Sequence, residues 1–130
     1  MQIITYLTNL FKATFVVSES DKKELEFRIR FSECFFKEKY FLHSDSSEQK
    51  LAFILNVSEA YLSNYISSNF NMDFFALCNK NRIEHFQEAM EDPKNSEIPI
   101  SSLIMGSGFD SVESFKASLQ SDKSDFKAWN

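Results

Sequence analysis

The stretch from Ser47 to Phe70, SEQKLAFILNVSEAYLSNYISSNF, contains the pattern that decides the fold. Its apolar residues recur at spacings of three and four, which is typical of amphipathic helices. The tripeptide Asn56-Val57-Ser58 interrupts this pattern, and the Ser58 hydroxyl can cap the helix that follows it. Since two short helices joined by a tight turn make a helix-turn-helix, we predict such a unit over about 47–69.

A second unit of the same kind is predicted farther along the sequence. The apolar pattern indicates a short helix over about 100–105, and Gly106-Ser107-Gly108 forms the turn after it. Asp110 and Glu113 then make a capping-box pattern, which opens the next helix. The second helix-turn-helix unit therefore spans about 99–121.

A long linking helix is predicted between the two units, over about 73–91, because apolar residues again recur at helical spacing. We expect Asn71, which precedes it, to adopt the left-handed conformation at a turn. The polar stretch around Pro93 ends the helix. The residues expected to point toward the core are Phe74, Leu77, Cys78, Ile83, Phe86, Ala89 and Met90.

Residues 1–42 are predicted to form an N-terminal helical extension. One amphipathic helix is expected over about 3–15, and a second one after the capping-box pattern of Asp21 and Glu24. These helices carry more apolar surface than one helix needs, so we expect the extension to pack on the rest of the chain or to form a homodimer. The apolar stripe of the second helix consists of Phe27, Phe31 and Phe35.

Composition places the chain in the all-α class. Of its 130 residues only 2 are Gly and 2 are Pro, which is too few turn-formers for a sandwich or barrel of many short strands. No apolar stretch is long enough to span a membrane, so we expect a cytoplasmic protein. Cys34 and Cys78 lie far apart in no zinc-binding spacing, and we expect free, reduced thiols and no metal site.

Sequence patterns of known catalytic sites are missing from the chain. It contains no P-loop, no GxGxxG, no GxSxG and no HExxH. His43 and His85 are isolated, and no pattern brings either of them next to a cysteine that could act as a nucleophile. We therefore expect neither catalysis nor a cofactor.

The order of residues in the two units resembles that of a known family. Both units are in register, over about residues 44–130, with the double helix-turn-helix DNA-binding domain of AraC/XylS-family bacterial transcription regulators. The resemblance implies that residues 43–130 form a DNA-binding domain whose two units read successive major grooves of double-stranded DNA. The matching residues are Leu51-Ala52, Ser58, Tyr61-Leu62-Ser63, Arg82-Ile83, Ile100, Leu103, Gly108-Phe109 and Ser114-Phe115.

The resemblance also implies which side chains face the DNA. The candidate reading residues are Ala60, Ser63, Asn64 and Ser67 in the first unit and Val112, Glu113, Lys116 and Ala117 in the second. Arg82 matches a family position that mainly supports the backbone. From the residues alone, Arg82 would instead pair with a nearby carboxylate, and Ser63, Asn64 and Ser67 would form a solvated polar helix face.

The charge of the chain argues against nucleic acid as its partner. The formal net charge is −5, and from His43 onward 7 basic residues stand against 13 acidic ones. Because phosphate neutralisation supplies most non-specific DNA affinity, the alternative is a degenerate AraC-like module that acts in protein–protein interaction or dimerisation. DNA binding requires Lys80, Lys116, Lys123 and Lys127 on one face, whereas the alternative places Glu59, Asp73, Asp110 and Glu113 around it.

Overall fold

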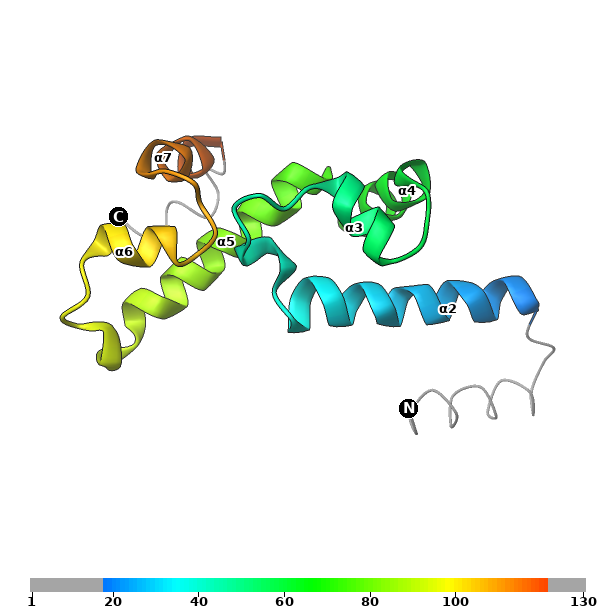
Figure 1. Ribbon diagram of the computed structural model, residues 1–130, viewed down its shortest axis with the longest axis horizontal. Helices are drawn as coiled ribbons and strands as arrows, with labels where there is room; N and C mark the ends of the chain where they lie inside the picture. Colours follow the sequence, from blue (N-terminus) through cyan, green and yellow to red (C-terminus); the bar gives the residue numbers. More distant parts are fainter. Residues whose placement is uncertain (1–17, 122–130) are drawn as a thin grey trace.

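The computed structural model describes residues 18–121, and every regular element in this range is a helix (Figure 1). The amphipathic helix expected over about 3–15 lies outside the described residues. The fold is all-α, and none of the described helices is both long and apolar enough to cross a membrane. In chain order the elements are α2 (Glu19–Ser32), the π-helical turn η1 (Glu33–Lys37), the short 3-10 helix η2 (Tyr40–Leu42), α3 (Glu48–Ile54), α4 (Glu59–Phe70), α5 (Phe74–Glu91), the 3-10 helix η3 (Pro93–Asn95), α6 (Ile100–Met105) and α7 (Val112–Ser121).

α3 and α4 form the first predicted helical pair, and both are capped by serine. The Ser47 hydroxyl accepts a hydrogen bond from the backbone N–H of Lys50 at 3.1 Å, and the Ser58 hydroxyl accepts one from that of Tyr61 at 3.0 Å. Asn71 ends α4 in the left-handed conformation, with φ of 57°. The expected cap at Ser58 and the expected conformation of Asn71 are therefore confirmed.

α2 and α7 begin with different caps from the predicted ones. The Ser18 hydroxyl accepts from the backbone N–H of Asp21 at 3.0 Å, and the Ser111 hydroxyl accepts from that of Ser114 at 3.0 Å. The capping boxes predicted to start at Asp21 and Asp110 are wrong, because in each case a serine directly before the first helical residue supplies the capping oxygen.

Two separate apolar cores lie along α5. The larger core is enclosed by α2, η1, η2, α3, α4 and the N-terminal half of α5, and it contains the predicted phenylalanine stripe of α2 and η1. The smaller core joins the C-terminal half of α5 to α6 and α7, and α5 is therefore the element that the two cores share. The buried residues of the smaller core are Ile83, Phe86, Ile104, Phe109 and Phe115.

The inward face of α5 differs from the predicted one at two positions. Met90 was expected in the core but is 45% exposed, because it lies in the last turn of α5, beyond the final core residue of this helix, Phe86. Arg82 was not expected in the core but is only 7% exposed. A charged side chain therefore sits between the two cores, where α5 passes from one to the other.

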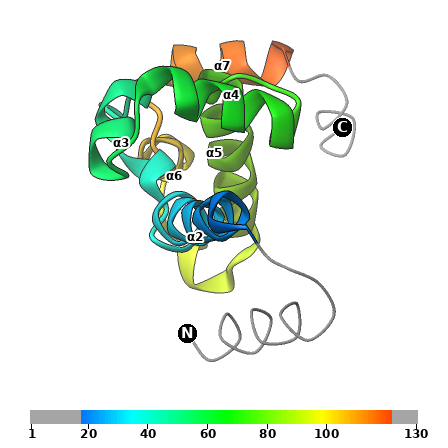
Figure 2. The ribbon, with the colours of Figure 1, turned by 90° about the vertical axis from the view of Figure 1, so that its right-hand side faces the viewer.

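The second helices of both units, α4 and α7, lie on one side of the molecule, and α2 lies on the other side (Figures 1 and 2). α4 and α7 are both viewed close to end on in Figure 1, and both extend along the top of Figure 2. Their axes therefore run in the same general direction. The side that holds α4 and α7 is the one on which a nucleic-acid interface must be sought.

Candidate nucleic-acid interface

α4 has an apolar back and a polar front. Leu62 and Ile66 are completely buried in the larger core, and Tyr65 is partly buried against it, while Ser63 and Asn64 face solvent. A helix of this kind can be held from behind while its front enters a groove. The candidate reading residues Ala60, Ser63 and Ser67 are on the exposed front, and Asn64 is exposed but also lines a groove between α4 and the beginning of α2.

α7 has the same two-sided character in the second unit. Phe115 is buried in the smaller core, and Val112 is partly buried and packs against that core. Glu113, Lys116 and Ala117 are exposed. The structure thus leaves Glu113 and Lys116 on the exposed face of α7, whereas Ala117 is exposed at a cavity between α7 and α5 and Val112 is partly buried.

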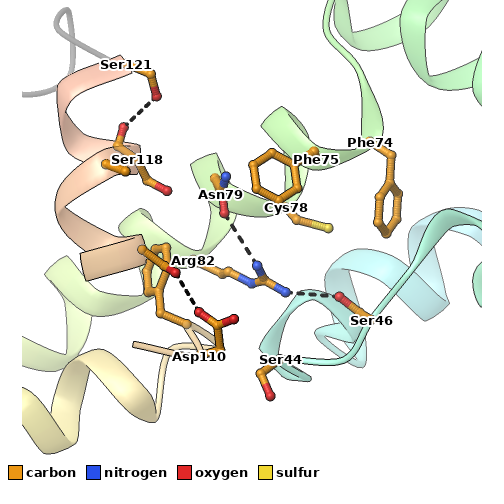
Figure 3. A pocket seen from close by; sticks show the side chains of 13 residues that line it. Ser44, Ser46, Phe74, Phe75, Cys78, Asn79, Arg82, Asp110, Ser118 and Ser121 are labelled. Atoms are coloured by element: carbon orange, nitrogen blue, oxygen red, sulfur yellow. Dashed lines mark hydrogen bonds between the residues drawn. The ribbon is translucent and has the colours of Figure 1, made fainter. Parts of the chain in front are cut away.

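Arg82 holds the segment before α3 against α5 (Figure 3). Its Nε donates a hydrogen bond to the Phe41 carbonyl at 2.6 Å, and its Nη2 donates to the His43 carbonyl and to the Ser46 hydroxyl, both at 3.0 Å. Its Nη1 lies 3.4 Å from the side-chain oxygen of Asn79. Carbonyl, hydroxyl and amide oxygens therefore take the place of the carboxylate that the residue pattern alone suggested.

Gly108 brings the second unit into direct contact with the same segment. Its φ is +100°, and a Cβ at this position would lie 2.5 Å from the Phe41 carbonyl oxygen and 2.9 Å from Leu42 Cα. The guanidinium carbon of Arg82 lies 5.9 Å from the centre of the Phe109 ring. The Gly108 turn and Arg82 form one joint, which fixes the two units relative to each other.

Acidic side chains lie close to both candidate reading helices. Glu59 and Glu113 are exposed in the first turns of α4 and α7, where a carboxylate stabilises the helix but repels a phosphate backbone. Burial raises the pKa of Glu48, and the neighbouring Glu59 and Asp73 raise it further. Three carboxylates are therefore gathered where α3, α4 and α5 begin.

Basic side chains are few on the two helices. α4 contains no Lys or Arg, and α7 contains only Lys116. Lys80 lies on the flank of α5 that faces η1 and the end of α4, whereas α7 approaches a different flank of α5. Lys123 and Lys127 lie outside the described residues. Of the two described lysines of the expected cationic face, only Lys116 lies on a candidate reading helix.

The two cysteines and His85 lie in partly or wholly buried surroundings. Burial raises the pKa of Cys78 to about 11 and also raises the pKa of Cys34, and both cysteines are free. Thiols of this kind are protonated at neutral pH and react slowly. His85 forms a hydrogen bond with the buried Ser107, and residues 18–121 contain no group of three or more side chains arranged to hold a metal ion.

Sequence reasoning missed the side chains that surround Arg82. Asn79 contacts its guanidinium, and the spacing of three residues along one helix is a pattern that could have revealed this pair. Ser46 and Asp110 line the same cavity as Arg82 but come from distant segments. No spacing in the sequence indicates that those two segments meet.

No protein-family model, no curated protein and no solved structure matches this chain.

Proposed function

We propose that this chain is a sequence-specific DNA-binding transcription regulator of AraC type that acts in the cytoplasm. The observation that carries the proposal is the placement of α4 and α7, two helices with polar fronts that lie on one side of the molecule. The resemblance of residues 44–130 to the AraC/XylS family supports the same function. In this proposal α4 enters one major groove of double-stranded DNA and α7 enters the next.

Each candidate residue has a role that follows from its chemistry. Asn64 suits adenine, and Ser63 and Ser67 suit base edges or phosphates. Lys116 contacts a phosphate or guanine, and Glu113 accepts a hydrogen bond from cytosine N4. The small or apolar side chains of Ala60, Val112 and Ala117 contact thymine methyl groups, while Arg82 acts indirectly by fixing the angle between the units.

The experiment that tests this function is a selection of binding sites from random duplex DNA at low ionic strength. We expect a sequence to be enriched, because two rigidly joined helices fix the spacing between two half-sites. Low salt is needed, since few cations face the DNA and electrostatic affinity falls as salt rises. A pool without any enriched sequence would contradict the proposal.

Three variants test the proposed contacts on the selected site. Lys116→Ala should weaken binding to all sequences and lower the salt slope by about one. Asn64→Ala should reduce discrimination at one base pair by about 1–3 kcal/mol. Lys94→Ala is the matched control, because Lys94 is exposed in η3, away from α4 and α7. An equal loss for Lys94→Ala and Lys116→Ala would remove Lys116 from the interface.

A second candidate function is protein–protein interaction or dimerisation by a degenerate module with little DNA affinity. The observation that favours it is the position of Glu59 and Glu113, exposed in the first turns where reading helices approach bases. A homodimer through residues 1–42 is compatible with both functions. Sedimentation of the full chain over a range of concentrations tests the dimer, and a monomer throughout would contradict it.

A further inference from the structure

A cavity of about 280 Å³ lies between the two units (Figure 3). Its walls are the segment 44–46, the N-terminal half of α5 and the inner flank of α7. Its volume corresponds to about nine water molecules at roughly 30 Å³ each, which is the size of a metabolite with about ten non-hydrogen atoms. A molecule in this cavity would touch both units at once.

Two side chains of opposite charge line this cavity without forming an ion pair with each other. The guanidinium of Arg82 is buried, and the carboxylate of Asp110 is exposed at the same cavity. The ion pairs found within residues 18–121 do not include either of them. Burial lowers the pKa of Arg82, while the Cys78 thiol and the Asp110 carboxylate act in the opposite direction.

Arg82 retains a hydrogen-bond donor for a ligand. Its Nη1 carries two N–H groups, and within residues 18–121 its hydrogen bonding is limited to the long contact with Asn79. The side-chain NH₂ of Asn79 has no hydrogen-bond partner in the same range. A carboxylate can accept from both groups, and hydrogen bonds between charged partners are the stronger kind.

Asp110 retains an acceptor for a ligand. Its Oδ1 accepts a hydrogen bond from the Ser114 hydroxyl at 2.6 Å, which orients the carboxyl group. Its second oxygen has no hydrogen-bond partner among the described residues. A carboxylate that is held in this way can accept a hydrogen bond from an ammonium group.

The remaining wall of the cavity includes apolar surface. Phe74, Phe75 and Ala117 line it, and Phe75 is 69% exposed despite its large ring. An apolar ligand group that covered this ring would remove apolar surface from water. The cavity therefore combines a cationic site, an anionic site and an apolar wall within the volume of one small molecule.

We propose that this cavity binds a free α-amino acid with an apolar side chain. Its carboxylate contacts Arg82 and Asn79, its ammonium group contacts Asp110, and its side chain lies against Phe75. If the proposed function holds, the amino acid is an effector, because it would contact both units and would favour the arrangement of the units to which it binds best.

The test is a calorimetric titration of the full-length protein, without DNA, with three compounds of similar shape. L-leucine carries both charges, isocaproate lacks the ammonium group and isoamylamine lacks the carboxylate. We expect saturable binding of L-leucine, and affinities lower by about tenfold for each of the other two, since one charge-assisted contact is lost. The absence of saturable leucine binding, or equal binding of all three compounds, would overturn the proposal.

Two variants locate the binding site. Asp110→Asn should lower leucine affinity by about tenfold and leave isocaproate affinity unchanged, because only the ammonium contact is lost. Ala117→Trp should abolish binding by filling the cavity, and its circular dichroism spectrum shows whether it is folded. Glu97→Gln is the control, an exposed carboxylate outside the cavity. Unchanged leucine binding by folded Ala117→Trp would place the ligand elsewhere and refute the site.

Failure of this inference can be distinguished from failure of the proposed function. Leucine binding without any DNA binding would support the site and contradict the transcription-regulator proposal. DNA binding without leucine binding would support the transcription-regulator proposal and contradict the amino-acid site. For a protein that binds both, leucine should change the affinity for the selected DNA site, and an unchanged affinity would refute the effector role.

Discussion

Arg82 is a single buried residue whose hydrogen bonds stabilise the contact between distant segments of the chain. Bringing a guanidinium group to 7% exposure costs hydration free energy, and its hydrogen bonds to Phe41, His43 and Ser46 offset that cost. Removing one partner of a buried charge is more damaging than never having had the charge. The contacts of Arg82 therefore indicate a structural role, in which it holds the two helical units together, and not a direct contact with DNA.

Gly108→Ala is expected to destabilise the protein by about 3 kcal/mol or more, because both a positive φ and a backbone clash oppose a side chain there. Gly106→Ala is the matched control within the same turn. Gly106 has φ of −68°, and a Cβ there would meet only the Ser102 carbonyl oxygen closely, at 3.2 Å. Its expected cost is about 1 kcal/mol or less. Urea unfolding measures both, and similar losses would contradict the joint at Gly108.

Because the Cys78 thiol is buried, we expect the folded protein to lose stability in alkaline solution. The folded pKa, about 11, lies above the ordinary value of 9.0, so the folded state favours the protonated thiol. This contribution is complete below pH 9 and is lost as the pH rises toward about 11, by about 2 kcal/mol. Urea unfolding across this range should show a steeper decline for the natural protein than for Cys78→Ala. Equal slopes would mean that the thiol is not buried.

At the scale of elements, helix positions were easier to predict than helix starts. α4 follows Ser58, the short polar residue directly before its apolar run and the expected cap. α3 follows Ser47, which is one of several short oxygens in the polar stretch 43–47, so spacing alone left its cap open. Before α2 and α7, several such oxygens stand close together, and Asp21 and Asp110 compete with Ser18 and Ser111. Which oxygen meets the free backbone N–H groups depends on where the chain enters the helix, and spacing does not encode that.

Ser58→Ala is expected to cost about 1 kcal/mol, because the backbone N–H of Tyr61 loses its capping oxygen at the start of α4. Ser68→Ala is the control, since Ser68 is exposed on the same helix and does not cap it. It should change the free energy of unfolding by less than about 0.5 kcal/mol. Thermal or urea unfolding measures both variants, and equal effects would show that the cap contributes nothing.

At the scale of the whole molecule, residues 18–42 are built into the larger core. Phe27, Phe31, Phe35, Tyr40 and Phe41 are all buried there and come from this part of the chain. The sequence predicted the phenylalanine stripe from its spacing. It did not predict that Arg82 and Gly108 would bind the end of this segment to both units, because those contacts join residues about 40 to 70 positions apart.

A chain that begins at residue 43 is therefore expected not to fold. Replacing one buried phenylalanine by alanine costs about 3–5 kcal/mol, and the loss of five aromatic residues exceeds the usual total stability of about 5–15 kcal/mol. A chain that begins at residue 18 keeps every described residue and is the control. Urea unfolding followed by circular dichroism compares them. A cooperative transition of similar midpoint in both would refute the role of this segment.

The candidate site was less predictable than the fold. Amphipathic spacing in 59–70 and 112–121 is enough to place the polar fronts of α4 and α7, since periodicity alone determines which side is outward. The cavity between the units could not be found in this way. Ser46, Asn79 and Asp110 line it and come from three distant segments. These segments lie together because of the way the two cores pack along α5, and sequence spacing does not encode that packing.

The unequal size of the two cores determines the order in which the molecule opens. Among residues 18–121 the smaller core has five buried apolar residues and the larger one twelve, so within this range α6 and α7 are held by less apolar surface than α3 and α4. Amide hydrogens of α7 should therefore exchange with deuterium faster than those of α4 under native conditions. The chain would then visit a state in which the second unit has unfolded while the first stays folded.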